Sequence, residues 1–164
     1  MDSDPAAAYS RSMSDKPELR QDAITTVREF FAALEMGAVD EALELLDPDI
    51  VWKNTSLPDV RGVSRVGGLL RGLSRESFGF RVDMHHIAIE ADGRPVSEGD
   101  TVLTERTDYL RAGPVEIGFW VCGTFELVDG RITLWHDHFS WENFLRGTVT
   151  GIWQAVRGST YSKR

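Results

Sequence analysis

Residues 101–139, TVLTERTDYLRAGPVEIGFWVCGTFELVDGRITLWHDHF, decide the fold, because they contain three strand patterns separated by two turn signals. The three patterns are rich in β-branched and aromatic residues, which favour pleated strands. They cover Thr101–Leu110, Val115–Val128 and Ile132–Phe139, and the turns are Ala112-Gly113-Pro114 and Asp129-Gly130. An Asp-Gly pair between two strand patterns is a strong hairpin signal. The stretch therefore predicts an antiparallel meander, and Phe80–Ile89 adds a strand before it.

Helical spacing precedes this meander. Apolar residues recur every three or four positions from Ile24 to Leu34, and Gly37 follows as a helix stop. The next segments are a short helix capped by Asp40, a strand over Ile50–Asn54 that follows Asp47-Pro48-Asp49, and a glycine-rich helix over Val63–Leu73. Mixed spacing from Trp141 onward indicates a helix near the C-terminus. Helices followed by a run of strands are typical of an α+β domain.

The composition is that of one ordinary globular domain. The chain has 164 residues, of which 41% are hydrophobic, and 18 basic against 26 acidic side chains give a formal charge of −8. Without a dense basic cluster, the sequence offers no footprint for nucleic acid or for an anionic membrane surface. A single cysteine excludes an internal disulfide, and no apolar run is long enough to span a membrane. We expect a cytoplasmic protein with a disordered leader over residues 1–16, a single domain over 17–158 and a flexible tail over 159–164.

Charged side chains occupy two strand faces that also carry apolar residues. Arg106 and Asp108 share a face of the Thr101–Leu110 strand, and Asp137 lies between Trp135 and Phe139 on the last strand. Buried charges are costly unless they pair, and one arginine can hydrogen-bond two carboxylates. Two coupled carboxylates favour one shared proton, which provides an acid and a base together. The pattern predicts either an ion network that fixes the fold or an acid–base site for a neutral substrate.

Three stretches of the chain carry more specific motifs. They are WKNTSLP over residues 52–58, VLTERTD over 102–108 and GTFELVDGRITLWHD over 123–137. In order and spacing, the chain over residues 23–144 resembles the limonene-1,2-epoxide hydrolase family. The resemblance implies the α+β cone of the nuclear-transport-factor-like superfold, in which N-terminal helices pack in the concave face of a strongly curved mixed, cystatin-like sheet. That superfold hosts many functions, so the motifs rather than the fold indicate an activity.

The resemblance also implies a role for each residue of this site. Asp108 donates a proton to the epoxide oxygen, Arg106 bridges the two carboxylates, and Asp137 takes a proton from the attacking water. Asn54 falls at the position that holds this water. Trp52 stands where the family usually has a water-binding tyrosine, and its indole N–H donates a hydrogen bond but cannot accept one. Trp52 is therefore either a water ligand or a core aromatic residue.

These roles suit epoxide chemistry. An epoxide opens with relief of strain, but its oxygen leaves poorly and water attacks poorly, so a positioned acid and base suffice without a cofactor. We expect a cofactor-independent epoxide hydrolase that acts on a hydrophobic terpenoid-, lipid- or sterol-like epoxide. Its pocket is predicted to be lined by Leu34, Leu110, Phe119, Val121 and Phe139. The alternatives are a non-catalytic binder of a hydrophobic ligand and an isomerase or cyclase of the same superfold.

Other features of the sequence carry weaker functional signals. His136 and His138 lie two residues apart without a third ligand of suitable spacing, so we expect no metal site. Cys122 has no adjacent base and is expected to be a small core residue. Large apolar residues exceed what one domain of this kind should bury, which predicts a homodimer, as the family resemblance also does. They are Phe119, Trp120, Val121, Trp141, Phe144 and Trp153.

Overall fold

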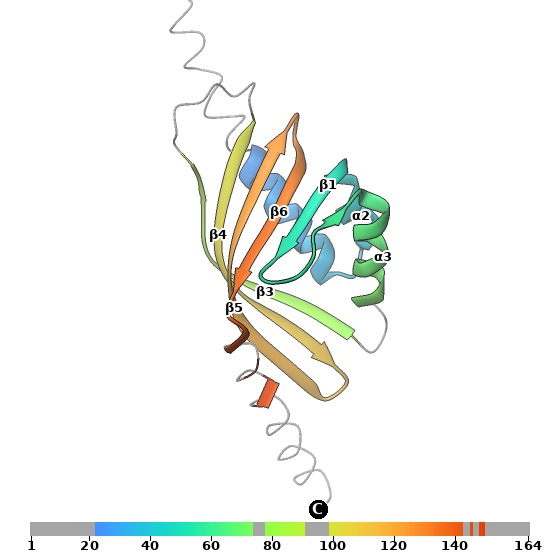
Figure 1. The fold of residues 1–164 in the computed structure, drawn as a ribbon, viewed down its shortest axis with the longest axis vertical. Coiled ribbons are helices and arrows are strands. Elements are labelled where there is room, and N and C mark those ends of the chain that lie inside the picture. Colours follow the sequence, from blue (N-terminus) through green and yellow to red (C-terminus); the bar gives the residue numbers. More distant parts are fainter. Residues whose placement is uncertain (1–21, 74–77, 91–98, 143–144, 146–147, 150–164) are drawn as a thin grey trace, which may run out of the picture.

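The computed structural model describes residues 22–73, 78–90, 99–142, 145 and 148–149. After a helix over residues 22–35, the elements are α2 (Val39–Glu44), β1 (Leu46–Asn54), β2 (Val60–Arg61), α3 (Val63–Leu73), β3 (Phe78–Ile89), β4 (Asp100–Ala112), β5 (Val115–Val128) and β6 (Arg131–Phe139). The strands form one curved sheet in the order β2-β1-β6-β5-β4-β3 (Figure 1). β1 runs parallel to β6, and the other neighbouring strands are antiparallel. The predicted α+β fold with a mixed sheet is confirmed.

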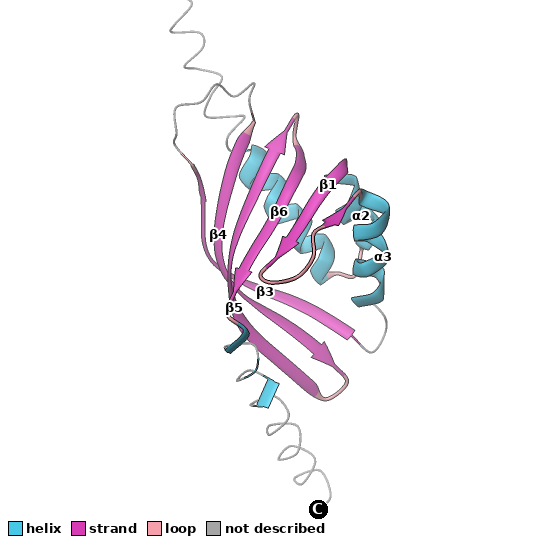
Figure 2. Ribbon diagram, viewed as in Figure 1, coloured by secondary structure: helices cyan, strands magenta, loops and turns pink. Residues whose placement is uncertain are grey.

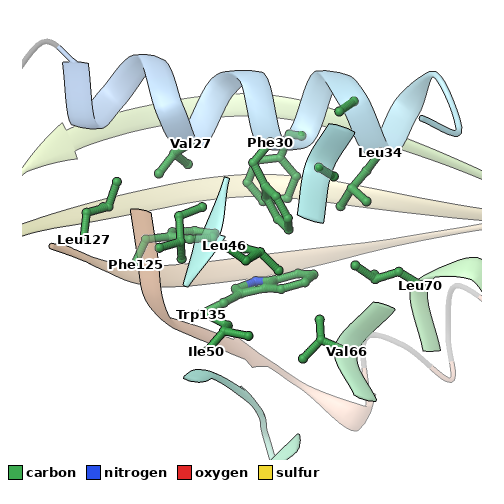
Figure 3. Close-up of a cluster of buried hydrophobic side chains, with 14 of the residues drawn as sticks. Val27, Phe30, Leu34, Leu46, Ile50, Val66, Leu70, Phe125, Leu127 and Trp135 are labelled. Atoms are coloured by element: carbon green, nitrogen blue, oxygen red, sulfur yellow. The ribbon is translucent and has the colours of Figure 1, made fainter. Parts of the chain in front are cut away.

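The helix over residues 22–35 crosses one face of the sheet, and α2 and α3 lie beside β1 (Figure 2). Val27, Phe30 and Leu34 point from this helix toward the sheet, as their three- and four-residue spacing predicts (Figure 3). The Phe30 ring packs edge to face against Trp135, with ring centroids 5.0 Å apart. Burial of side chains of this size contributes about 1.5–3 kcal/mol each. The core therefore lies between the helices and the inner face of the sheet.

The predicted starts of helix α2 and strand β1 are wrong. Helix α2 begins at Val39, Ala38 takes the cap position, and the carboxylate of Asp40 instead pairs with Arg71 of α3 at 2.6 Å. Strand β1 begins at Leu46 and so includes the Asp-Pro-Asp segment that was expected to precede it. The β1–β6 register shifts between Leu46 and Val51, so Pro48 lies in an irregular stretch where its missing N–H disrupts no regular ladder.

The glycine-rich helix α3 is confirmed with the predicted bounds. Gly67 allows close packing against α2, because a Cβ there would lie 2.6 Å from Cδ1 of Leu43 and that side chain would have to shift. At Gly68 and Gly72 a Cβ would meet nothing within 4 Å, so close packing explains only the first of the three.

The meander follows the predicted turns. Asp129 and Gly130 both have positive φ, 49° and 75°, which suits a two-residue hairpin loop between β5 and β6. The predicted leader, tail and most of the C-terminal helix lie outside the described residues. In the described part of the chain, no helix is long and apolar enough to cross a membrane.

Candidate active site

The two strand faces that carry charge meet on the inner side of the sheet. Arg106 and Asp108 of β4 and Asp137 of β6 are all buried. Strand β5 lies between these two strands, and Gly123 of β5 is the cross-strand neighbour of Asp137. The period-two alternation of a strand thus directs all three charged side chains to the core side, as the sequence predicted.

Arg106 joins the two carboxylates with charge-assisted hydrogen bonds. Its Nε donates to Oδ1 of Asp108 at 2.8 Å, and its Nη2 donates to Oδ2 of the same carboxylate at 3.2 Å. Nη2 also donates to Oδ1 of Asp137 at 2.7 Å. The guanidinium has no exposed surface, so these bonds form where water does not screen them.

Three further residues surround the guanidinium, and sequence reasoning assigned none of them to the site. Nη1 of Arg106 donates to Oγ1 of Thr104 at 2.9 Å. The Phe31 ring lies under the guanidinium, with its centroid 4.6 Å from Cζ. A Cβ at Gly123 would collide with Nη1 of Arg106 and would lie 2.6 Å from Oγ1 of Thr104. Because Gly123, in the GTFEL motif, has no side chain, the guanidinium of Arg106 can occupy this space.

The protonation states follow from burial and charge. Burial raises the pKa of Asp108 to about 6; Arg106 opposes this shift, whereas the charges of Asp137 and Glu35 add to it. Burial alone would lower the pKa of Arg106, but the charges of Asp137 and Asp108 outweigh it and raise that pKa. The site therefore holds a permanent cation beside a carboxyl that retains its proton to higher pH than an exposed aspartate does.

A cavity of about 210 Å³ opens beside the two aspartates, and Asp108 and Asp137 both line it. Four of the five predicted pocket residues line it as well, namely Leu34, Leu110, Phe119 and Phe139. Trp52 and Asn54, predicted as site residues, also line it. Val121 does not line the cavity, because its cross-strand neighbours Arg106 and Phe139 are larger and leave it no exposed surface.

Sequence reasoning missed four residues that line the cavity. They are Leu57, Leu70, Phe80 and Trp135. Leu70 and Trp135 carried a usable signal, because helical and strand spacing places each on a core-facing side. Leu57 follows the end of β1 and Phe80 lies near the start of β3, where no periodicity indicates a pocket.

Trp52 stacks on Trp135, with ring centroids 4.5 Å apart and planes at 14°. Its Nε1 is buried and donates to no acceptor in the described structure. The indole thus presents its ring, rather than its N–H, as cavity wall. The stacking suits the core interpretation of Trp52, and the water-ligand interpretation stays a prediction.

The outer face of the sheet carries the histidines and the cysteine. His136 and His138 lie side by side, with ring centroids 3.9 Å apart, and Cys122 is the cross-strand neighbour of His138. Burial is the main cause that lowers the pKa of His136, and electrostatic interactions with His138 and Lys53 lower it further. No cluster of three potential metal ligands occurs among the described residues. Cys122 was expected in the core, but it is half-buried on this outer face, because residues of β5 at even positions point away from the helices.

The family model described as the limonene-1,2-epoxide hydrolase catalytic domain matches residues 21–150. Epoxide hydrolase EphG of Mycobacterium tuberculosis is 39% identical over 126 residues, which cover 77% of this chain and 78% of that protein.

Solved structures give a similar result. A structure of an M. tuberculosis LEH-like epoxide hydrolase is 39% identical, with a TM-score of 0.74, covering 85% of this chain and 98% of that one. A putative polyketide cyclase from Xanthomonas campestris is 17% identical, with a TM-score of 0.61, covering 79% and 98% of the two chains. At that identity, the second similarity extends to the fold alone.

Proposed function

The chain belongs to the limonene-1,2-epoxide hydrolase family and is an epoxide hydrolase of that type, and from this premise we propose its mechanism and substrate class. The enzyme adds water directly to a neutral, hydrophobic epoxide of terpenoid, lipid or sterol type and releases a vicinal diol. The observation that carries this proposal is the buried Asp108–Arg106–Asp137 network at the wall of an apolar cavity.

Asp108 is the general acid in the proposed mechanism. Its raised pKa keeps a proton available, and that proton moves to the epoxide oxygen as the C–O bond breaks. Arg106 holds the carboxyl by two hydrogen bonds and stays charged throughout. Because the acid must be protonated, kcat/KM should fall as the pH rises through about 6.

Asp137 is the general base, and Asn54 is the ligand of the attacking water. Both side chains line the cavity, and their residues are paired in the β1–β6 register. The water oxygen bonds to an epoxide carbon while Asp137 takes one of the water protons. The site is restored when that proton returns to Asp108, whose carboxylate shares Nη2 of Arg106 with Asp137.

The cavity wall supports a neutral substrate. Apart from Asn54 and the two aspartates, the lining residues are leucine, phenylalanine and tryptophan. Arg106 does not line the cavity, and its Nε, Nη1 and Nη2 donate to Asp108, Thr104 and Asp137. A substrate carboxylate would meet two acidic side chains without a compensating cation. An isomerase would need a base but no water ligand, so the position of Asn54 beside Asp137 favours hydration.

A single turnover in H₂¹⁸O tests the direct attack of water. We expect the label in the diol and none in the protein, because no carboxylate becomes esterified. Mass spectrometry of the diol and of peptides that contain Asp108 or Asp137 measures both. Label in either aspartate would contradict direct attack, and the absence of diol from a panel of hydrophobic epoxides would contradict the proposed substrate class.

Replacement of Trp52 by phenylalanine tests whether its indole N–H holds water. Because Nε1 is buried and the ring stacks on Trp135, we expect kcat to stay within about threefold and KM to rise. Trp52→Tyr serves as the second variant and should bring no gain over phenylalanine. A fall in kcat of about tenfold or more in Trp52→Phe, reversed in Trp52→Tyr, would instead assign the donor to the water.

We also propose that the enzyme is a symmetric homodimer. Trp120 and Leu103 on the outer face of the sheet are 42% and 43% exposed, and Trp141 is 41% exposed. Phe119 and Val121 do not contribute to this exposed surface, since they face the core, and Phe144 and Trp153 lie outside the described residues.

Sedimentation should show twice the 18.4 kDa chain mass at micromolar concentration, and Trp120→Ser should shift the protein toward monomer. Leu69→Lys on α3 is the control and should stay dimeric; a monomeric wild type would contradict the proposal.

A further inference from the structure

We propose that Thr104 is a positioning residue of this active site, whose hydroxyl fixes the rotation of the Arg106 guanidinium and thereby the placement of both aspartates. This inference rests on the proposed function and assigns a role to a side chain that does not line the cavity.

The Thr104 hydroxyl is oriented as an acceptor. Its Oγ1 donates its single proton to the carbonyl oxygen of Gly123 at 3.4 Å and accepts from Nη1 of Arg106 at 2.9 Å. The threonine is buried, so solvent does not compete for either bond. The hydroxyl thus links the guanidinium to the backbone of β5 through one short bond to Nη1 and one longer contact with the Gly123 carbonyl oxygen.

The nitrogens of the guanidinium have two kinds of partner. Nε and Nη2 face the two carboxylates, and Nη1 faces the hydroxyl. A neutral acceptor suits this third corner, because a carboxylate there would compete with Asp108 and Asp137 for the same cation. Without an acceptor, a buried N–H would be left unpaired, which favours rotation of the guanidinium away from the aspartates.

Two neighbours accommodate the guanidinium in this orientation. The Phe31 ring covers one side of its plane, and the missing side chain of Gly123 provides the space beside Nη1. Neither supplies a hydrogen bond to Arg106. The hydroxyl is therefore the directional part of the support, and the ring and the glycine are its steric part.

Loss of the hydroxyl should also change the acidity of Asp108. Arg106 lowers the pKa of this carboxyl, while burial, Asp137 and Glu35 raise it. If the guanidinium moves away from Asp108, the lowering contribution weakens and the pKa rises further. The falling limb of the pH profile then moves to higher pH, which a loss of stability alone would not cause.

Thr104→Val is the test, because valine keeps the shape and removes the acceptor. We expect kcat to fall by about 10- to 100-fold with KM nearly unchanged, and the falling limb of kcat/KM to move to higher pH. Thr104→Ser should restore both values. Thr133→Val is the matched control: it removes a threonine hydroxyl that donates to the Glu126 carbonyl oxygen on the same sheet, away from Arg106, and should have no effect on activity.

A second readout separates this inference from the proposed function. The ¹³C titration of the Asp108 carboxyl, identified with Asp108→Asn, should shift upward in Thr104→Val even if the wild type forms no diol from the epoxides tried. If valine prevents folding, Thr104→Cys replaces it, since sulfur is a weak acceptor, and is compared with Thr104→Ser. Equal titration midpoints and equal turnover in folded hydroxyl-bearing and hydroxyl-free variants would overturn the role of Thr104.

Discussion

Asp137→Asn should lower kcat by about 10²- to 10⁴-fold while the protein stays folded, and Asp108→Asn should do the same. Asparagine keeps the shape of either side chain and an oxygen that accepts from Arg106, but it neither takes a proton from water nor gives one to an alkoxide. Steady-state rates with one hydrophobic epoxide, together with thermal melting curves, measure the two effects separately.

A double variant tests whether the two aspartates act in the same step. Acid and base act in the same step, so Asp108→Asn combined with Asp137→Asn should cost little more activity than either change alone. Asp83→Asn, an exposed aspartate paired with Arg81, is the control and should retain full activity. Near-native turnover in Asp137→Asn would remove its proposed role as base.

Arg106→Met should destabilise the protein by about 3–5 kcal/mol at pH 8, because it leaves two buried carboxylates without their cation. The loss should shrink at pH 5. The pKa of Asp108 is higher in the folded state than in the unfolded state. Between these two pKa values the folded protein binds more protons than the unfolded one, so the contribution of Asp108 to the free energy of unfolding falls as the pH rises through that window. Removal of Arg106 raises the folded pKa further and widens the window.

Urea unfolding at pH 5 and pH 8 measures this difference. Arg71→Met breaks the exposed pair with Asp40 and is the control, with an expected change of about 0–1 kcal/mol at both pH values. Equal stability of Arg106→Met and the wild type at pH 8 would show that the network does not depend on its cation.

Strand periodicity was sufficient to predict which polar side chains share a face, whereas their chemical roles were implied by the family resemblance. In a pleated strand, alternate residues share a face, so Arg106 with Asp108, and Trp52 with Asn54, had to point the same way. Sequence spacing did not determine which strands are neighbours. The β1–β6 pairing that brings Asn54 beside Asp137 depends on the register of the whole sheet.

The support of the site was not predictable for the same reason. Thr104 and Gly123 are ordinary strand residues until β4 and β5 pair in register and place them opposite each other. Val121 has the correct parity for the cavity but is covered by its neighbours, and parity says nothing about depth. The errors at Asp40 and Pro48 arose locally, where an ion pair between helices and an irregular ladder outweighed the usual preferences of these residues.

The residues that form the site and its cavity fall into two groups, according to the elements that carry them. Asp108, Arg106, Asp137 and the groups that hydrogen-bond to Arg106 or Thr104 come from β4, β5 and β6. Leu34, Leu57 and Leu70 come from a helix, a turn and a second helix, and their contribution to the cavity is shape alone. We expect conservative substitutions at these leucines to change which epoxides fit the cavity, whereas a side chain at position 123 would collide with Arg106. A laboratory search for altered substrate range should therefore randomise the three leucines and leave the three strands intact.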